Sequence, residues 1–493
     1  MRYLSTRNKD ISRLPHEAVI HGLAPDGGLY VPESLNVHFD VNDFLDKDYQ
    51  GIAEVILSAF LDDYPKETIQ ACVRNAYDEK FDTKKIVPLK QTQDGYLMEL
   101  FHGPTSAFKD LALTILPHLL TSAYQLENRK DMIAILTATS GDTGKAALSG
   151  FADVPHTTVT VFYPTDGVSP VQKKQMQTAR GNNVCVYGVE GNFDDCQRMV
   201  KEACSDPDIL PKSGNVTISS ANSINIGRLI PQMVYYWNSY VQLVRSGTIK
   251  AGEEVSFVVP TGNFGDILAG YLAKCTGLPV KTLICASNTN NVLTDFLETG
   301  TYSVHRPFHM TMSPSMDILI SSNLERLLYL ESNGDAELTA SLMKQLKEEG
   351  SYTVPEELLQ KIQQDFRGYW TSEEECRKVI HDLYEKEGTL IDPHTAVAYH
   401  AMEKYKAEGN TETCVVLSTA SPFKFSRNVL SCISQDVPED DFACMKMLSE
   451  KTGLTVPAGL AELESLPVRF TETIPVEKGM AVIRRRLEEV SHD

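Results

Sequence analysis

The sequence predicts an α/β fold with a mostly parallel, doubly wound sheet. From about residue 90 onward, short apolar runs rich in β-branched residues alternate with segments of helical character. This alternation is typical of parallel strands that are buried on both faces and joined by helices. The length of 493 residues and the apolar share of 42% allow two or three domains.

Four apolar runs are the expected strands, and a helical segment follows each of them. They cover residues 133–139, 158–164, 255–260 and 413–419. Ligands of such sheets bind outside the carboxyl ends of the strands. We therefore expect the chemistry of this protein at these four strand ends.

The flanking regions have a different character. Residues 1–88 contain the turn-rich GLAPDGGLYVPE and the helical GIAEVILSAFL, which indicate a small N-terminal unit. Residues from about 295 to 385 are rich in charged helix formers and predict a helical insertion or cap.

Charge and composition exclude several classes of partner. The formal net charge of −20 repels nucleic acid and anionic membranes, so we expect neither as a partner. The ten cysteines contain no CxxC pair, which argues against a metal site and for a reducing compartment. No apolar run approaches the ~20 residues of a membrane span. We expect a cytoplasmic protein, either monomer or homodimer, that acts on a small molecule.

Two glycine-containing turns each lie between a strand and a helix. In TGNFGD, Gly262 and Gly265 let the backbone approach an anion at the start of a helix. In SGDTGKAA the two glycines are closer together, and Ser140 and Thr143 add hydroxyl donors, which suits a smaller anion such as a carboxylate. Either turn could also be purely structural.

Lys109 in FHGPTSAFKD is the candidate nucleophile. It lies among small and aromatic residues, including Phe101 and Phe108. Burial among such residues lowers the pKa of an amine, and a neutral amine can form an imine. Together, a desolvated lysine and two anion sites predict pyridoxal 5′-phosphate (PLP), a cofactor anchored both covalently and by its phosphate. Neither HExxH nor GxSxG occurs in the chain.

Seven motifs in register resemble the threonine synthases of the fungal and enterobacterial type, most closely the vertebrate threonine synthase-like branch. They are FHGPTSAFKD, TSGDTGKAA, NSINIGRLIPQ, TGNFGD, PSMDILISSN, DPHTA and STASPFKF. The N-terminal LAPDGGLYVPE is similar to the first domain of that family. The resemblance implies PLP fold type II, the tryptophan-synthase-β type. Its two doubly wound α/β domains would be residues 89–250 and 251–493, preceded by the N-terminal domain 1–88.

The resemblance also implies roles for individual residues. Lys109 would hold the cofactor and move protons at the α and β carbons of the substrate. The residues implied for the cofactor phosphate are Thr261, Gly262, Asn263, Phe264 and Gly265. Thr419 would face the pyridine nitrogen. Those implied for the cofactor O3′ edge and the substrate carboxylate are Ser140, Gly141, Asp142 and Thr143. Those implied for the phosphate of the substrate are Asn225, Arg228 and Lys424.

One departure from the motifs of the family bears on the function. The family has STAHP where this chain has STASP, so Ser421 stands in the place of a histidine. A serine does not titrate near neutral pH and reaches less far than an imidazole. Making threonine requires controlled addition of water at Cβ, and that step is the one in doubt.

We therefore expect a PLP-dependent phospho-lyase. It would release 2-oxobutyrate, ammonia and phosphate from O-phosphothreonine, O-phosphohomoserine or both. The alternatives are a true threonine synthase and a non-catalytic relative that binds partner proteins. His102 and His394 lie within family motifs and are either packed histidines or proton carriers.

Overall fold

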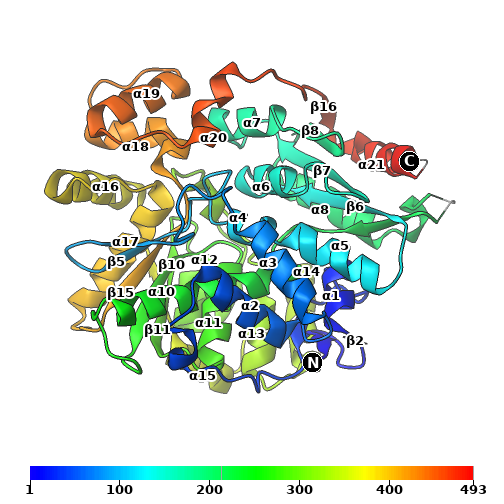
Figure 1. The fold of residues 1–493 in the computed structure, drawn as a ribbon, viewed down its shortest axis with the longest axis horizontal. Coiled ribbons are helices and arrows are strands. Elements are labelled where there is room, and N and C mark those ends of the chain that lie inside the picture. Colours follow the sequence, from blue (N-terminus) through cyan, green and yellow to red (C-terminus); the bar gives the residue numbers. More distant parts are fainter. Residues whose placement is uncertain (212–213, 492–493) are drawn as a thin grey trace.

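The computed structural model describes residues 1–211 and 214–491, and only the backbone of residues 194, 205 and 207. Two sheets form its framework (Figure 1). A five-stranded parallel sheet in the order β16-β8-β7-β6-β9 lies above a six-stranded sheet in the order β14-β11-β10-β15-β5-β4. The second sheet is parallel except for β4, which runs antiparallel to β5. The predicted α/β fold is confirmed.

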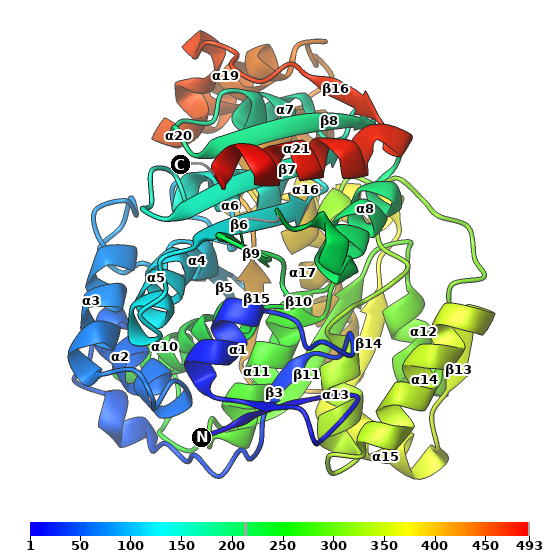
Figure 2. The same cartoon turned by 90° about the vertical axis from the view of Figure 1, so that its right-hand side faces the viewer.

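The five-stranded sheet has helices on both faces because successive side chains of its strands, which point to opposite faces, are buried and mostly apolar. Ile133 and Ile135 of β6 belong to one buried cluster, whereas Ala134 and Leu136 belong to another. The strands are β6 (Met132–Ala138), β7 (Thr157–Pro164), β8 (Val184–Glu190), β9 (Val216–Ser219) and β16 (Thr473–Pro475). The helices around them are α4 (Asp110–Leu113), α5 (Leu116–Leu126), α6 (Asp142–Gly150), α7 (Pro170–Gln177), α8 (Phe193–Ser205) and α21 (Gly479–Val490). Figure 2 shows α21, in red, lying across this sheet beside α8.

The six-stranded sheet is buried in the same way. Phe257 of β10 packs into one cluster and its neighbour Val258 into another. The strands are β4 (Leu89–Gln91), β5 (Tyr96–Glu99), β10 (Val255–Pro260), β11 (Val280–Ser287), β14 (Phe366–Trp370) and β15 (Cys414–Ser418). The associated helices are α9 (Ile226–Leu229), α10 (Met233–Arg245), α11 (Gly265–Cys275), α17 (Pro393–Ala407) and the short η5 (Pro422–Phe425). The four expected strands are thus β6, β7, β10 and β15.

The sheets do not follow the order of the chain. Strands β4 and β5 precede the whole five-stranded sheet in the sequence, yet they pair into the six-stranded sheet. Near the other end of the chain, β16 pairs with β8 of the five-stranded sheet. Each sheet therefore contains strands from both sides of residue 250. The expected domains, residues 89–250 and 251–493, are instead continuous stretches of the chain.

The N-terminal unit packs against both the upper and lower parts. It contains β1 (Tyr3–Ser5), β2 (Ser12–Arg13), α1 (Pro15–His21), β3 (Tyr30–Pro32), α2 (Tyr49–Phe60) and α3 (Lys66–Ala76). Helix α1 contacts α5, and α2 contacts α10. Its apolar side chains are part of the largest buried cluster of the protein.

The insertion is mainly helical but also contains strands that the prediction did not include, among them the antiparallel pair β12 and β13. It holds α12 (Val292–Thr299), β12 (Thr301–Ser303), η4 (Pro314–Met316), α13 (Leu324–Glu331), α14 (Ala336–Glu349), β13 (Ser351–Thr353), α15 (Glu356–Asp365) and α16 (Glu373–Glu387). Within it, β14 is an edge strand parallel to β11, where a continuing helical region was expected.

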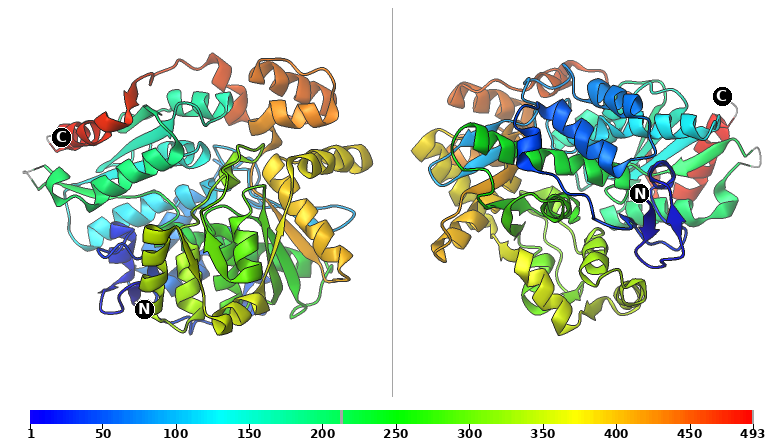
Figure 3. Two further views of the ribbon diagram at one scale, coloured as in Figure 1. Left: turned by 180° about the vertical axis from the view of Figure 1, so that it is seen from behind. Right: turned by 60° about the horizontal axis from the view of Figure 1, so that its bottom comes forward.

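The remaining C-terminal helices are α18 (Ser426–Ile433), α19 (Asp441–Thr452) and α20 (Ala458–Ala461). Seen from behind, they lie on the side of the upper sheet, in orange and red (Figure 3). Among the residues that the structure describes, no helix is both long and apolar enough to cross a bilayer.

Candidate functional site

A cavity of about 680 Å³ is lined by segments that follow the carboxyl ends of β6, β9, β10 and β15. Its position is the one expected for parallel sheets. The predicted site residues that line it are Lys109, Ser140, Asp142, Thr143, Arg228, Thr261, Gly262, Asn263, Phe264, Gly265 and Thr419. The predicted residues Gly141, Asn225 and Lys424 do not belong to its lining.

Lys109 is held in place by the loop that precedes it. Asp110 accepts hydrogen bonds from the Thr105 backbone nitrogen (2.8 Å) and the Thr105 hydroxyl (2.7 Å), which closes the loop on itself. The Phe108 nitrogen donates to the Thr419 carbonyl oxygen (2.8 Å), which ties the loop to the end of β15. The side chain of Lys109 is therefore carried by backbone that is fixed on both sides.

The environment of Lys109 makes its amine reactive. Burial lowers its pKa to about 8, Asp142 opposes that shift, and the positive charges of Lys424 and Arg228 reinforce it. Its Nζ lies 3.8 Å from Asp142 Oδ2 and 4.5 Å from the centre of the Phe108 ring. An amine with a pKa near 8 is neutral in an appreciable fraction of molecules near neutral pH, which nucleophilic attack requires.

Asp142 is the anion of the site. Lys424 Nζ lies 2.6 Å from its Oδ1, and Gln172 Nε2 donates to the same oxygen (2.9 Å). Burial would raise the pKa of Asp142, but Lys424 and Lys109 together hold it well below its usual range. Asp142 therefore stays ionised at neutral pH, between two lysines.

Some backbone N–H groups of the turn at residues 139–144 form hydrogen bonds within the turn. The Thr139 hydroxyl accepts hydrogen bonds from the backbone nitrogens of Gly141 and Gly144, both at 2.9 Å. Gly141 has φ = 136°, and a Cβ there would lie 2.5 Å from the side chain of Gln172. The residues of this turn that line the cavity are Thr139, Ser140, Asp142 and Thr143.

The second turn, residues 261–265, forms a cup at the start of α11. Phe264 adopts a left-handed conformation (φ = 60°), and its ring packs on Phe366 with centroids 5.6 Å apart. The Asn263 carbonyl accepts hydrogen bonds from the backbone and side chain of Asn323. The first backbone N–H groups of a helix have no partner within it and favour an anion such as phosphate.

The lysine and the cup together fit PLP. Gly262 lies so close to the Ser315 carbonyl oxygen that an added Cβ would be 2.6 Å from it, so the cup is built for backbone alone. A buried amine of lowered pKa opens onto the same cavity as this cup. These are the covalent and phosphate anchors that the cofactor requires.

Replacing Gly262 by alanine is expected to weaken PLP binding about tenfold or more, because the new methyl group must displace the Ser315 backbone and distort the cup. Titration of apoprotein with PLP measures the effect. Gly265→Ala is the matched control, since its Cβ would meet the Asn323 amide at 3.3 Å, and that side chain can move. Equal losses in both variants would contradict this account.

The three residues implied for the substrate phosphate make contacts with different parts of the protein. Arg228 lines the cavity, and its Nη1 donates to the Ala221 carbonyl (2.9 Å). Asn225 donates to the Val19 carbonyl (3.0 Å) and accepts from the Gly227 nitrogen. Lys424 is fully buried between Asp142 and the Thr105 carbonyl. That Asn225 and Lys424 contact the phosphate of the substrate directly stays a prediction.

Ser421 and His394 lie close to the site in different roles. The Ser421 hydroxyl accepts a hydrogen bond from the Phe423 nitrogen and caps η5. His394 lines the cavity, with Nδ1 2.6 Å from Asp392 Oδ2 and Nε2 accepting from the Ser315 nitrogen (3.1 Å). Its two ring nitrogens are both engaged, so His394 holds the Ser315 segment. His102 does not belong to the lining.

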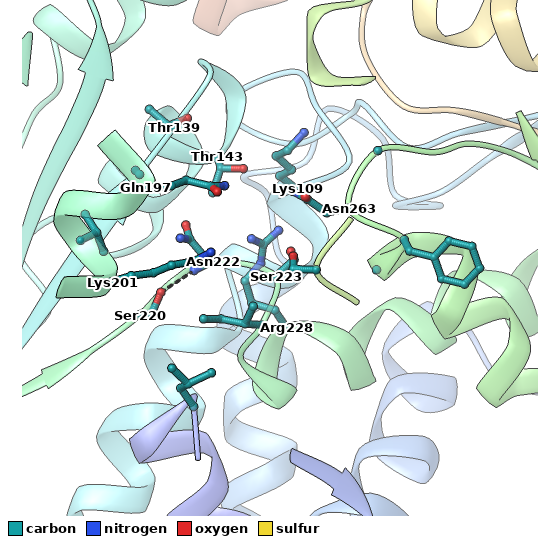
Figure 4. A pocket seen from close by; sticks show the side chains of 18 of the residues that line it. Lys109, Thr139, Thr143, Gln197, Lys201, Ser220, Asn222, Ser223, Arg228 and Asn263 are labelled. Carbon is teal, nitrogen blue, oxygen red and sulfur yellow. Dashed lines mark hydrogen bonds between the residues drawn. The ribbon is translucent and has the colours of Figure 1, made fainter. Parts of the chain in front are cut away.

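Sequence reasoning missed several lining residues. Asp266 follows Gly265 directly and accepts hydrogen bonds from Tyr235 (2.6 Å) and Tyr236 (2.9 Å). Burial raises the pKa of Asp266 to about 6. Others lie on α8 and on the loop after β9, namely Gln197, Lys201, Ser220, Asn222 and Ser223 (Figure 4). No local motif marks the α8 residues, because only the position of the helix over the cavity gives them a role.

Comparisons with known families match most of the chain. Residues 2–77 match the family described as threonine synthase N terminus, and residues 91–420 match the family of pyridoxal-phosphate dependent enzymes. Residues 395–483 match the family described as threonine synthase, C-terminal.

Individual proteins are similar over most of this chain. It is 37% identical over 464 residues to the threonine synthase of Saccharomyces cerevisiae, which covers 88% of this chain and 89% of that one. It is 39% identical over 432 residues to human threonine synthase-like 1, which covers 85% of this chain. This chain spans 58% of the length of that protein.

Solved structures are similar over the full length. PLP-bound threonine synthase from Brucella melitensis superposes with a TM-score of 0.87 at 35% identity, covering 100% of both chains. Yeast threonine synthase also gives 0.87, at 34% identity and 99% of both chains. The PLP fold expected from the motifs is confirmed.

Proposed function

The chain belongs to the threonine synthase family of PLP-dependent enzymes, and on that premise we propose that it eliminates phosphate from a phosphorylated amino acid. The substrate is O-phosphothreonine, O-phosphohomoserine or both, and the products are 2-oxobutyrate, ammonia and phosphate. The observation that supports this most is Lys109, an amine with a pKa near 8 on the cavity that also holds the cup.

The residues proposed to hold the cofactor are those of the cup, residues 261–265, together with Lys109, Asp142 and Thr419. When bound, PLP supplies an electron sink that makes the substrate α-proton acidic. Thr419 is proposed to meet the pyridine nitrogen with its hydroxyl. Because a hydroxyl is a neutral partner, it favours elimination over transamination.

Lys109 is proposed to be the catalytic base. Its amine takes the proton from the substrate α-carbon, and the same amine moves protons at Cβ when phosphohomoserine loses its γ-phosphate. In phosphothreonine the bond from Cβ to the phosphate oxygen breaks, and the phosphate leaves with the bonding electrons. Asp142 lies 3.8 Å from Nζ and stabilises the ammonium that forms.

We propose that the protein orients the substrate by binding its carboxylate at one end and its phosphate at the other. The turn with Ser140, Gly141 and Thr143 receives its carboxylate. Arg228 receives its phosphate, with Asn225 and Lys424 as further proposed ligands. Arg and Lys suit a phosphate because their hydrogen bonds to it are charge-assisted.

Ser421 favours release over hydration. Its hydroxyl caps η5, and Ser421 does not line the cavity in the part of the chain that the structure describes. The enamine that leaves the site would hydrolyse to 2-oxobutyrate and ammonia. The alternative function is threonine synthase, in which water adds at Cβ before release.

Incubating PLP-loaded protein with each phospho-amino acid tests the proposal. We expect phosphate and 2-oxobutyrate in equal amounts. Phosphate accompanied by threonine would favour the alternative function, and a colourless protein after PLP addition would favour a non-catalytic binding relative.

The variant Ser421→His is expected to increase the threonine fraction of the product if hydration is the missing step. Amino-acid analysis of the reaction mixture measures it, and Ser421→Ala, which also loses the cap of η5, is the control. A threonine fraction no higher than in Ser421→Ala would show that the histidine position does not decide the outcome.

We also propose that the protein works in the cytoplasm, as a monomer or homodimer, on a small molecule. The support is its charge of −20, which disfavours nucleic acid and anionic membranes as partners.

A further inference from the structure

We propose that helix α8 carries the specificity site for the substrate phosphate, with Gln197 and Lys201 completing the set of donors begun by Arg228 and Asn222. This inference rests on the proposed function and assigns a place to the phosphate monoester of its substrate. The site lies on the wall of the cavity that α8 and the loop after β9 form (Figure 4).

A phosphorylated substrate needs a second anion site. The cup at residues 261–265 is taken by the cofactor phosphate, so the substrate phosphate must find other donors on the same cavity. A phosphate dianion removed from water requires charge-assisted donors. The overall charge of −20 makes these local donors more important, since the field of the whole protein repels the substrate.

Arg228 indicates where that anion belongs. It is only 3% exposed, and burial lowers its pKa to about 10. No ion pair joins it to a carboxylate of the described residues, and its buried Nε has no hydrogen-bond partner among them. A buried cation without a counter-ion is costly, and an anionic ligand in the adjoining cavity would remove that cost.

One face of α8 is turned towards the same space. Five of its lining residues are related by steps of three and four, which places them on one side of the helix: Phe193, Gln197, Val200, Lys201 and Cys204. Ala203, which also lines the cavity, lies beside this face.

The outer side of α8 carries a separate ion-pair row. Arg198 pairs there with Asp195 (2.8 Å) and Glu202 (3.9 Å). Lys201 and Gln197 are thus set apart from this row by their position on the helix.

The side chains converge in the cavity. In Figure 4, Gln197 and Lys201 extend from α8 towards Thr143 and Asn222, and Arg228 points up beside Asn222 and Ser223 from below. The loop that carries Asn222 is fixed, because its nitrogen donates to the Ser220 hydroxyl (3.1 Å). Lys109 and Asn263 of the cup lie on another side of the same cavity.

Three acidic residues of the described chain also line the cavity, and each has a contact of its own. Asp142 pairs with Lys424 at 2.6 Å. Asp206 caps the short helix η2 (Pro207–Ile209) through the Asp208 nitrogen. Asp266 lies at the cup and is held by two tyrosine hydroxyls.

Binding of inorganic phosphate to the PLP-loaded protein tests the site without turnover. In Lys201→Ala we expect the Kd for phosphate, measured by calorimetry, to rise about tenfold or more, as for loss of a charge-assisted hydrogen bond. Gln197→Ala should have a smaller effect, of about threefold. Binding of L-threonine, which has no phosphate, should not change when followed by the absorbance of the cofactor.

Arg198→Ala is the matched control, because it removes a cation from the outer side of the same helix. It should leave the Kd for phosphate unchanged. An unchanged Kd in Lys201→Ala, equal weakening of phosphate and threonine, or a wild-type protein that binds no phosphate would each overturn the assignment. If the site holds but neither phospho-amino acid is cleaved, the proposed function fails and the phosphate site stands.

Discussion

Replacing Lys109 by alanine is expected to remove the covalently held cofactor and to lower phosphate release by about 10³-fold or more. The residue is proposed to act twice, as the anchor of PLP and as the base at Cα, and positioned acid–base groups alone contribute 10²–10⁴-fold. The absorbance of added PLP should be that of the unattached cofactor. Absorbance spectra and a phosphate-release assay measure the two effects.

Lys145 provides an internal control for this assignment. Burial lowers its pKa to about 8 as well, so its amine is also more easily deprotonated than that of an exposed lysine. Lys145 does not belong to the cavity lining. Borohydride reduction followed by mass spectrometry should therefore find the pyridoxyl group on Lys109 alone. An adduct on Lys145, or on neither lysine, would contradict the account of the site.

The parts of the fold that the sequence predicted are those set by local chemistry. The strands β6, β7, β10 and β15 are buried on both faces, so their apolar and β-branched residues run without interruption. The two turns after β6 and β10 contain glycines whose neighbours leave no room for a side chain. Such constraints appear directly in the sequence.

Two of the strands that were not expected, β14 and β16, depend on distant partners. Strand β14 contains Arg367 and Gly368 and lies at an edge, where only one side needs pairing. Strand β16 has three residues and is a strand only because β8 lies beside it. Propensity is weak for such short edge segments, and tertiary contacts decide their structure.

The site residues also fall into those that the sequence could predict and those that only the fold could show. Lys109 and the cup could be predicted because their motifs are local. The contact between Asp142 and Lys424 joins two segments that are distant in the sequence. The motifs assign Lys424 to the substrate phosphate, whereas in the fold its Nζ lies 2.6 Å from the buried carboxylate of Asp142. The face of α8 was missed because its residues are polar and ordinary, and only the position of the helix over the cavity gives them a role.

Lys424→Met is expected to lower the free energy of unfolding by about 3–5 kcal/mol, the usual cost of removing one partner of a buried ion pair. Asp142 is then left with Lys109 at 3.8 Å as its counter-ion. The pKa of Asp142 is held low in the folded protein, so its ion pair stabilises the fold above the unfolded pKa and is lost as the pH falls through the folded one. The whole decrease in the free energy of unfolding is therefore expected at neutral pH, and unfolding by denaturant at that pH measures it.

The variant also changes the reactivity of Lys109. Lys424 is one of the charges that lower the pKa of Lys109, so removing it should raise that pKa above about 8. Covalent uptake of PLP requires the neutral amine, and its rate should therefore reach half its maximum at a higher pH than in the wild type. In the double variant Asp142→Asn with Lys424→Met, neither charge is buried alone, and much of the lost stability should return. If Lys424→Met instead raises only the KM for the phospho-amino acid, with unchanged stability and unchanged PLP uptake, then Lys424 binds the substrate phosphate directly and its pairing with Asp142 is secondary.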